Sequence, residues 1–113
     1  MSTSSNASIS AVVVPTDAAF SRSVGSVEYR DAVALVIEAP SSLDGDVTTR
    51  SIQVSSNGTT WASLVDAGGA VTLPGAGQAR HYFEMIPTFY WRIAYNAAPA
   101  VAETWTVTKQ WTA

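Results

Sequence analysis

The feature that most constrains the fold is the way short apolar runs alternate with turn residues along the chain. No window of 11 or more residues has the 3.6-residue periodicity of an amphipathic helix. Segments rich in β-branched and aromatic residues instead end at proline or glycine every 8–12 residues or so. This pattern predicts an all-β fold: a single-domain β-sandwich or jelly roll of about eight short antiparallel strands. An open Greek-key barrel is the alternative.

The clearest local prediction is a hairpin in the middle of the chain. Residues 50–55 alternate, with Ile52 and Val54 on one face and polar side chains on the other. Asn57-Gly58 follows, and this dipeptide favours a tight hairpin turn because both residues tolerate positive φ. We expect residues 60–65 to return as the partner strand, with Trp61 packed over the hairpin.

The other expected strands have the same apolar character. Shorter ones are predicted at residues 27–29, 33–37 and 81–86, the second of them covered on both faces. Alternation predicts two core-facing sets: Phe89, Trp91, Ile93 and Tyr95 on one strand, and Trp105, Val107, Lys109 and Trp111 on the last. The last strand carries Thr104, Thr106, Thr108 and Gln110 on its other face, which predicts a half-buried strand with its polar side outward.

The length of 113 residues suits one domain that is stabilised by packing, because the chain has no cysteine. Residues 1–10 are mostly Ser, Thr, Asn and Ala, and we expect them to form a flexible N-terminal arm. Residues 11–113 then form the β-sandwich domain. The first residues resemble no signal peptide, so we expect synthesis in a cytoplasm.

The charge pattern argues against two classes of partner. The net charge is −3, and the five arginines and one lysine are spread singly, so no basic patch for nucleic acid is expected. No apolar run approaches the roughly 20 residues of a membrane helix. Charged residues make up only 13% of the chain, against about 25% in typical domains. Such a surface suits packing against copies of the chain or another protein, with a simple Thr-rich β surface as the equal alternative.

Catalytic motifs are missing from the sequence. Histidine occurs once, at His81, and no nucleophile elbow or zinc-protease pattern is present. The carboxylates fall mostly at turns and strand ends. Asp44-Gly45-Asp46 could offer oxygen ligands to calcium, but ordinary turn chemistry explains it better. We therefore expect no enzyme activity, no catalytic residue, no metal ligand and no cofactor.

Three segments resemble sequences of known families. Ser51-Ile52-Gln53-Val54-Ser55-Ser56-Asn57-Gly58-Thr59-Thr60-Trp61 resembles a motif of small bacteriophage virion proteins of β-sandwich type and, more weakly, of discoidin-like galactose-binding jelly rolls. Tyr90-Trp91-Arg92-Ile93 and Thr104-Trp105-Thr106-Val107-Thr108 also look like segments of such phage proteins. The resemblance spans roughly residues 47–111. It transfers no binding residue.

The resemblance to phage proteins implies a non-enzymatic virion protein, either a capsid decoration (cement) protein or a head or tail accessory protein. We expect it to assemble on a coat lattice as a homo-oligomer such as a trimer, since closed symmetry is usual. Tyr82 and Tyr90 alternate with the inward set, so we expect them to be exposed. The expected partner-binding residues are Ser2, Thr3, Ser4, Ser5, Asn6, Ile9, Tyr82 and Tyr90. The alternative is a glycan-binding jelly-roll module with Tyr or Trp as the stacking platform. An enzyme with clustered carboxylates around His81 comes third.

Overall fold

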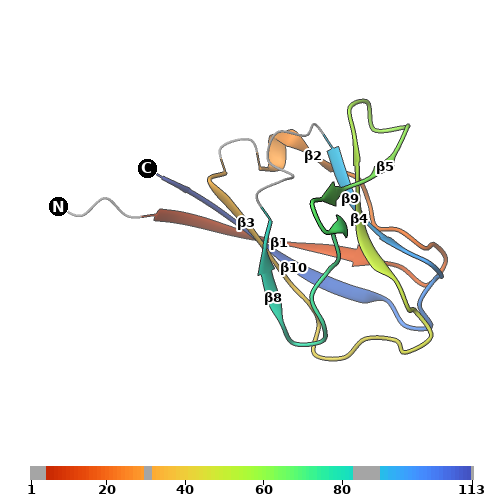
Figure 1. Ribbon diagram of the computed structural model, residues 1–113. Helices are drawn as coiled ribbons and strands as arrows, with labels where there is room; N and C mark the ends of the chain where they lie inside the picture. The colour runs from red at the N-terminus through yellow and green to blue at the C-terminus, as the bar shows by residue number, and fades with distance from the viewer. Residues whose placement is uncertain (1–4, 30–31, 83–89, 113) are drawn as a thin grey trace.

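Two antiparallel sheets face each other in the computed structural model, which describes residues 5–29, 32–82 and 90–112 (Figure 1). The first sheet has the order β1 (Ser5–Val14), β10 (Glu103–Thr112), β3 (Ala34–Glu38) and β8 (Ala79–His81). The second has the order β2 (Val24–Gly25), β9 (Tyr90–Tyr95), β4 (Arg50–Ser55) and β5 (Ala62–Ser63). A separate hairpin pairs β6 (Val65–Asp66) with β7 (Gly69–Ala70). The predicted all-β sandwich is confirmed, with ten strands in the described residues.

The core lies between the two sheets, and Trp91, Ile93, Tyr95, Trp105 and Val107 of the predicted inward sets are part of it. The first sheet contributes buried side chains at Val12, Val14, Leu35, Ile37, Trp105 and Val107. The second contributes Val24, Ile52, Trp91, Ile93 and Tyr95. Since strand side chains alternate between faces, each of these strands turns its other residues outward. Lys109 and Trp111, predicted as core, are half-buried, and the Lys109 ammonium lies 4.9 Å from the Trp111 ring centroid.

The longest ladder of the fold joins the two ends of the chain. β1 and β10 pair antiparallel from Ser5↔Thr112 to Val14↔Glu103 without a break in register. The expected flexible arm over residues 1–10 is therefore wrong for residues 5–10, and residues 1–4 lie outside the described residues. A run of small polar residues resembles a linker in composition. Next to a long strand, however, its backbone gains a full set of hydrogen bonds whatever its side chains are.

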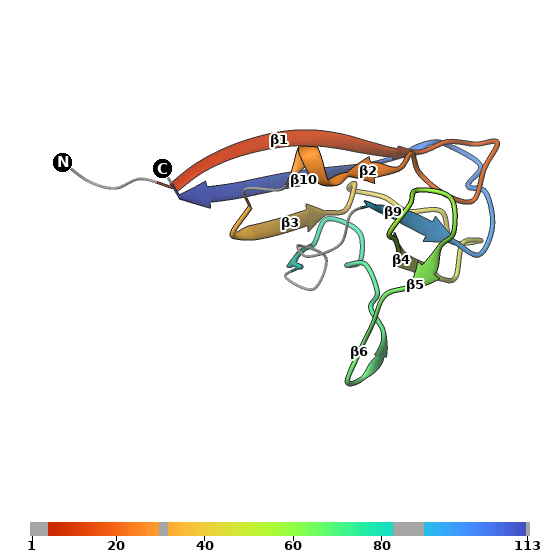
Figure 2. The same ribbon diagram turned by 90° about the horizontal axis from the view of Figure 1, so that it is seen from above.

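The N-terminal end of β1 and the C-terminal end of β10 extend together away from the second sheet. Figure 1 and Figure 2 both show this end of the first sheet projecting beyond the second sheet. Residues 5–10 and 107–112 pair with each other at this end, and β3 pairs with residues 106–110 on the other side of β10. β1 forms one edge of the first sheet.

The central hairpin forms where Asn57-Gly58 predicted it, but with a longer loop. β4 pairs with β5 through Gln53↔Ser63 and Val54↔Ala62, so the partner strand is shorter than residues 60–65. Gly58 has φ +78°, whereas no described non-glycine residue has positive φ, so the turn is not a two-residue type I′ turn. The Asn57 side chain instead accepts hydrogen bonds from the backbone N–H groups of Thr59 and Thr60, at 2.9 Å each. That side-chain cap stabilises the wider loop.

Three shorter predictions differ from the structure in detail. Residues 26–28 form a 3-10 turn, η1 (Ser26–Glu28), and not the expected strand at residues 27–29. The Glu28 carboxylate accepts two hydrogen bonds from Arg22, at 2.9 and 3.0 Å, across this turn. The strand expected at residues 33–37 is β3, shifted by one residue. β8 ends at His81, and the rest of the strand expected at residues 81–86, like Phe89, falls mostly outside the described residues.

Candidate functional site

The outer face of the first sheet is nearly free of charge. The strand registers align its outward residues: Ala7, Ile9, Ala11 and Val13 on β1; Thr104, Thr106, Thr108 and Gln110 on β10; Val36 and Glu38 on β3; and Ala79 and His81 on β8. We call this set the outer face. Glu38 is its one charged residue, and His81 its one other titratable residue, among those just named. Large apolar side chains remain exposed on it, with Ile9 73% and Val13 39% accessible.

The free edge of β1 borders the outer face. The carbonyl of Gln110 accepts a hydrogen bond from Val33 N–H at 2.8 Å, so the even-numbered residues of β10 turn their backbone groups toward β3. Because backbone groups alternate in direction along an antiparallel strand, the odd-numbered residues of β10 bond to β1. Their partners in register are even-numbered, for example Ser8 opposite Lys109 and Ser10 opposite Val107.

The odd-numbered residues of β1 consequently have two exposed features each. Their N–H and C=O groups point to the open edge, and their side chains lie on the outer face. No hydrogen bond from another described residue reaches the backbone of Ala7, Ile9, Ala11 or Val13 at this edge. A row of unpaired donors and acceptors of this kind is a template for adding a further strand.

A shallow apolar hollow lies at the C-terminal end of this edge. Its volume is about 430 Å³, and its lining residues are Ala11, Val13, Pro15, Ala18, Phe20, Ser21 and Arg22. The segment after β1 forms the far wall, because it crosses to the second sheet. There, Phe20 forms a bridge with Ala94 and Ser21 N–H donates to Ile93 O at 2.9 Å. The hollow thus has one wall from β1 and one from this crossing segment.

The second sheet carries a different outward feature, an arginine between two aromatic rings. The Arg92 guanidinium lies 4.1 Å from the Phe20 ring centroid and 4.4 Å from that of Trp61. Its Nε donates to Gln53 Oε1 at 2.7 Å. The surrounding rings partly remove the cation from water, and this desolvation lowers the pKa of Arg92. Such a stack fixes the cation in place and leaves Phe20 44% exposed.

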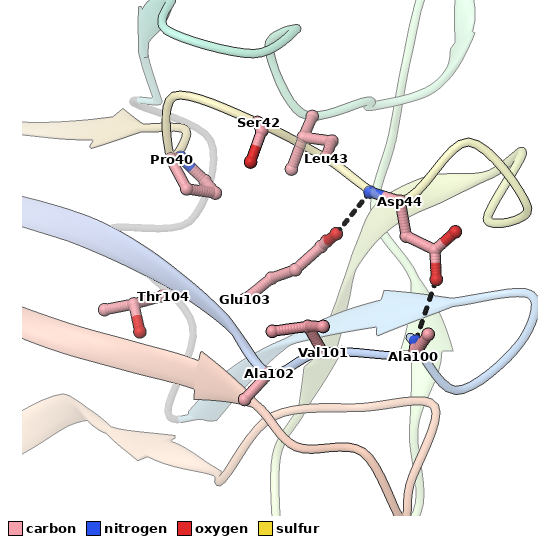
Figure 3. Close-up of a pocket in the computed structure, with 9 residues that line it drawn as sticks. All are labelled: Pro40, Ser42, Leu43, Asp44, Ala100, Val101, Ala102, Glu103 and Thr104. Carbon is pink, nitrogen blue, oxygen red and sulfur yellow. Dashed lines mark hydrogen bonds between the residues drawn. The ribbon is translucent and has the colours of Figure 1, made fainter.

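A cavity of about 390 Å³ opens between the loop after β3 and the start of β10 (Figure 3). Glu103 lies in its wall and is buried. Figure 3 shows its carboxylate bonded to the Asp44 backbone N–H, and the Asp44 carboxylate bonded to the Ala100 N–H. The distances are 2.6 and 2.8 Å. The bonds from Ala100 and Asp46 N–H to the Asp44 carboxylate hold the pKa of Asp44 below its ordinary value.

Glu103 is the centre of a hydrogen-bond network that uses both its oxygens. Its Oε1 accepts from Tyr95 Oη at 2.6 Å and from Arg50 Nε at 3.2 Å. Its Oε2 accepts from Arg50 Nη2 at 3.3 Å as well as from the Asp44 N–H. Trp105 Nε1 donates to Tyr95 Oη at 2.6 Å, which extends the network into the core.

This network has the chemistry of a structural site. Burial, together with the hydrogen bond to Glu103, raises the pKa of Tyr95 well above its ordinary value. The phenol therefore stays protonated, and it uses its proton to bond the carboxylate. A carboxylate that already accepts four hydrogen bonds is poorly placed to take a proton from a substrate in the cavity. The network closes one end of the sandwich.

The expected partner-binding residues are distributed unevenly. Ser2, Thr3 and Ser4 lie outside the described residues, and Ser5 and Asn6 belong to β1. Ile9 is highly exposed on the outer face. Tyr82 contradicts the expectation of exposure, because it is fully buried and its Oη donates to Thr72 O at 2.7 Å. β8 ends before this residue, so the alternation that was extended through it from His81 does not apply.

Tyr90 is half-buried, not fully exposed. Its ring lies over two glycines, since a Cβ on Gly25 or Gly58 would lie 3.7 or 3.8 Å from it. Sequence reasoning placed Tyr90 and Arg92 on one outward face of the same strand, and that assignment holds for the register of β9. It did not foresee Phe20, which reaches Arg92 from an irregular segment with no strand periodicity.

Sequence reasoning also missed the residues of β1 beyond Ile9. Ala7 was assigned to the flexible arm, and Ala11 and Val13 only to the β-sandwich domain. The alternation of Ser8, Ser10, Val12 and Val14 with these residues was the available signal for one strand with an apolar outer face. The signal was weak because the inner side of β1 begins with Ser8 and Ser10. These serines look like a continuation of the serine-rich start of the chain, and not like the inner face of a strand.

Two other kinds of site are absent from the described residues. Among residues 5–29, 32–82 and 90–112 there is no group of three or more His, Cys, Asp or Glu side chains placed to hold a metal ion. The same ranges contain no helix that is long and apolar enough to cross a membrane. His81 lies exposed at the end of β8 on the outer face.

Comparison with protein-family models, with curated proteins and with solved structures finds no match for this chain. Its function is therefore inferred from the geometry of the described residues and from the sequence itself.

Proposed function

We propose that this protein is a non-enzymatic structural protein that assembles with other protein subunits through the outer face and the free edge of β1. Its closest functional class is that of virion components, either a capsid decoration protein or a head or tail accessory protein. The resemblance of residues 47–111 to small phage virion proteins supports this class. The role needs no catalytic group, metal or cofactor.

The observation that carries the proposal is the uncharged, partly apolar outer face that ends in a long strand edge. Exposed apolar side chains scattered singly are normal, but Ile9, Ala11 and Val13 lie in one row beside unpaired backbone groups. Threonines on β10 flank that row. A protein partner meets both needs, because it removes the apolar side chains from water and bonds the backbone groups.

The proposed role is tested on purified particles. Particles of the phage whose genome encodes this chain are banded in a density gradient and analysed by quantitative mass spectrometry. We expect the protein to co-sediment with the coat protein at a fixed ratio. Recombinant protein added to particles from which it has been stripped should bind them and restore their infectivity and thermal stability. Absence of the protein from washed virions, at full infectivity and full thermal stability of the particles, would overturn the virion role.

A second candidate is a glycan-binding module, and the stack around Arg92 favours it. Phe20 and Trp61 present aromatic surface beside a fixed cation and the Gln53 amide, a combination that can stack on a sugar ring and bond its hydroxyls. Titration of a broad glycan panel against tryptophan fluorescence tests it, with Trp61→Ala as the variant that should lose the response. A flat response of the parent protein across the panel would contradict glycan binding.

A further inference from the structure

We propose that β1 of one copy pairs antiparallel with β1 of a second copy, around a two-fold axis. The pairing joins two four-stranded sheets into one continuous sheet. This inference rests on the proposed function in that it names the partner for the same surface. It replaces the trimer expected from the sequence with a dimer, because one free edge on each copy pairs with one other edge.

β1 differs from every other edge of the two sheets. The opposite edge of the first sheet, β8, has three residues, including Arg80 and His81. The edges of the second sheet, β2 and β5, have two residues each. β1 has ten. Short strands and charges are the devices by which proteins protect edges from pairing, and three of the four edges use one of them.

β1 itself uses none of these protections. Residues 5–14 contain no charged residue and no proline, and the ladder with β10 contains no bulge. Pro15 comes directly after the strand. The N-terminal end of β1 also projects beyond the second sheet, which leaves its edge accessible to another subunit (Figure 2). An edge that is long, regular and uncharged favours pairing with another strand.

A second copy is the partner that this edge fits best. In a two-fold antiparallel pairing, the same patch meets itself, so residues with edge-facing backbone groups lie opposite one another. On β1 these are the odd-numbered residues, whose side chains are apolar at positions 7, 9, 11 and 13. The chain carries a net charge of −3, yet this contact brings no like charges together. Arg22, at the hollow, is already paired with Glu28.

The hollow selects a register. Pairing Ile9 with Ala11 of the second copy places the exposed Ile9 side chain beside the wall that Ala11 and Val13 form. The same register places Val13 opposite Ala7 and puts Ser10 opposite Ser10 on the two-fold axis. Each hollow then receives apolar surface from the other copy. The Ser10 pair falls between the hydrogen-bonded pairs, where side chains of antiparallel strands approach most closely.

Solution mass is the first test. Light scattering during size-exclusion chromatography, over a hundredfold range of concentration, should give twice the mass of one chain. Ile9→Lys places a charge at the centre of the contact and should weaken dimerisation by about tenfold or more. Val65→Lys is the matched control, because Val65 is 61% exposed on the β6–β7 hairpin, and it should remain dimeric. A monomer or a trimer for the parent chain would overturn β1 pairing.

Ile9→Pro adds a variant that acts on the backbone alone. The N–H of Ile9 points to the free edge, so proline there removes a donor for the second copy and leaves the ladder with β10 intact. Ser8→Pro removes a ladder donor and should destabilise the fold itself. Urea unfolding separates the two outcomes. A folded Ile9→Pro variant that still dimerises like the parent would contradict the proposal.

A cysteine at the axis tests the register. The chain has no cysteine, so Ser10→Cys introduces a single thiol. Under mild oxidation it should form a disulfide-linked dimer quickly and completely, while Val65→Cys should react only slowly. Equal rates for the two variants would overturn the register. A dimer found for a protein that is absent from virions would refute the proposed virion role alone, whereas a virion-bound monomer would refute β1 pairing alone.

Discussion

The two ends of β10 lie in opposite surroundings. At its start, Glu103 and Trp105 are buried, and each polar atom of the network around them has a partner. At its end, residues 107–112 pair with β1, whose far edge bonds to no described residue. One strand thus runs from a closed polar network to an open edge.

This contrast separates the residues that hold the fold from those available to a partner. Arg50 and Glu103 form their ion pair with side chains only 13% and 6% exposed. Burial makes each charge dependent on the other, so the pair specifies one arrangement of the loops around it. At the β1 edge, side chains are exposed and mostly lack polar partners. Substitution there should alter association and leave the fold nearly unchanged.

The largest expected effect on stability is at the buried network around Glu103, at the start of β10. Glu103→Gln keeps the shape of the side chain but leaves the buried Arg50 cation without its counter-charge, which should lower the free energy of unfolding by about 3–5 kcal/mol. Urea unfolding followed by tryptophan fluorescence measures the loss.

The matched control is Glu28→Gln, in the exposed pair of Arg22 and Glu28. Their side chains are 46% and 37% exposed, and such pairs contribute about 0–1 kcal/mol. Similar losses of unfolding free energy for the two variants would show that the buried Arg50–Glu103 pair matters no more to stability than the exposed pair.

The two buried tryptophans give a sharper comparison. Trp105 Nε1 donates to Tyr95, whereas Trp91 Nε1 has no hydrogen-bond partner. Both rings are fully buried, so phenylalanine leaves a similar gap at either position. Trp105→Phe should therefore cost about 1–2 kcal/mol more than Trp91→Phe, because only it breaks a buried hydrogen bond. Thermal unfolding of both variants measures the difference, and a larger cost at Trp91 would be the opposite of this expectation.

The next effect in size is the loss of stability at alkaline pH, which acts on Tyr95 in the network around Glu103. The pKa of Tyr95 is raised in the folded protein, so above the ordinary value of 10.0 the unfolded chain loses this proton while the folded protein keeps it. The unfolded state then binds fewer protons, and stability falls as pH rises from about 10. Tyr95→Phe should flatten this fall between pH 9 and 11 or so. Urea midpoints across that range test it, and an unchanged slope would contradict the role of Tyr95.

Much of the fold follows from the sequence by alternation. The inward positions of β9 and β10 were predicted because their apolar residues recur at every second position over six or more residues. The Asn57-Gly58 turn was also placed correctly. Its loop length was not, because the Asn57 side chain caps the backbone in place of a positive φ at that residue. Local propensity identified the turn but not its hydrogen bonds.

The candidate site was harder to predict because it depends on pairing between distant segments. The first ten residues look disordered by composition, and only the ladder to residues 103–112 makes residues 5–10 a strand. The buried network joins Asp44, Arg50, Tyr95 and Glu103 from separate loops and strands, and no sequence pattern links them. Tyr82 was misplaced since alternation was extended beyond the end of β8.

The smallest expected effect on stability is at the open edge. Ile9→Thr keeps a β-branched side chain at a position that is 73% exposed, so the free energy of unfolding should change by less than about 0.5 kcal/mol. The measurement is made at protein concentrations where the parent is monomeric, because association adds stability that depends on concentration. At high concentration the parent should gain stability and the variant should gain less. A loss of 2 kcal/mol or so in the monomer would show that Ile9 packs within its own subunit, and the open edge would then belong to the fold and not to a partner.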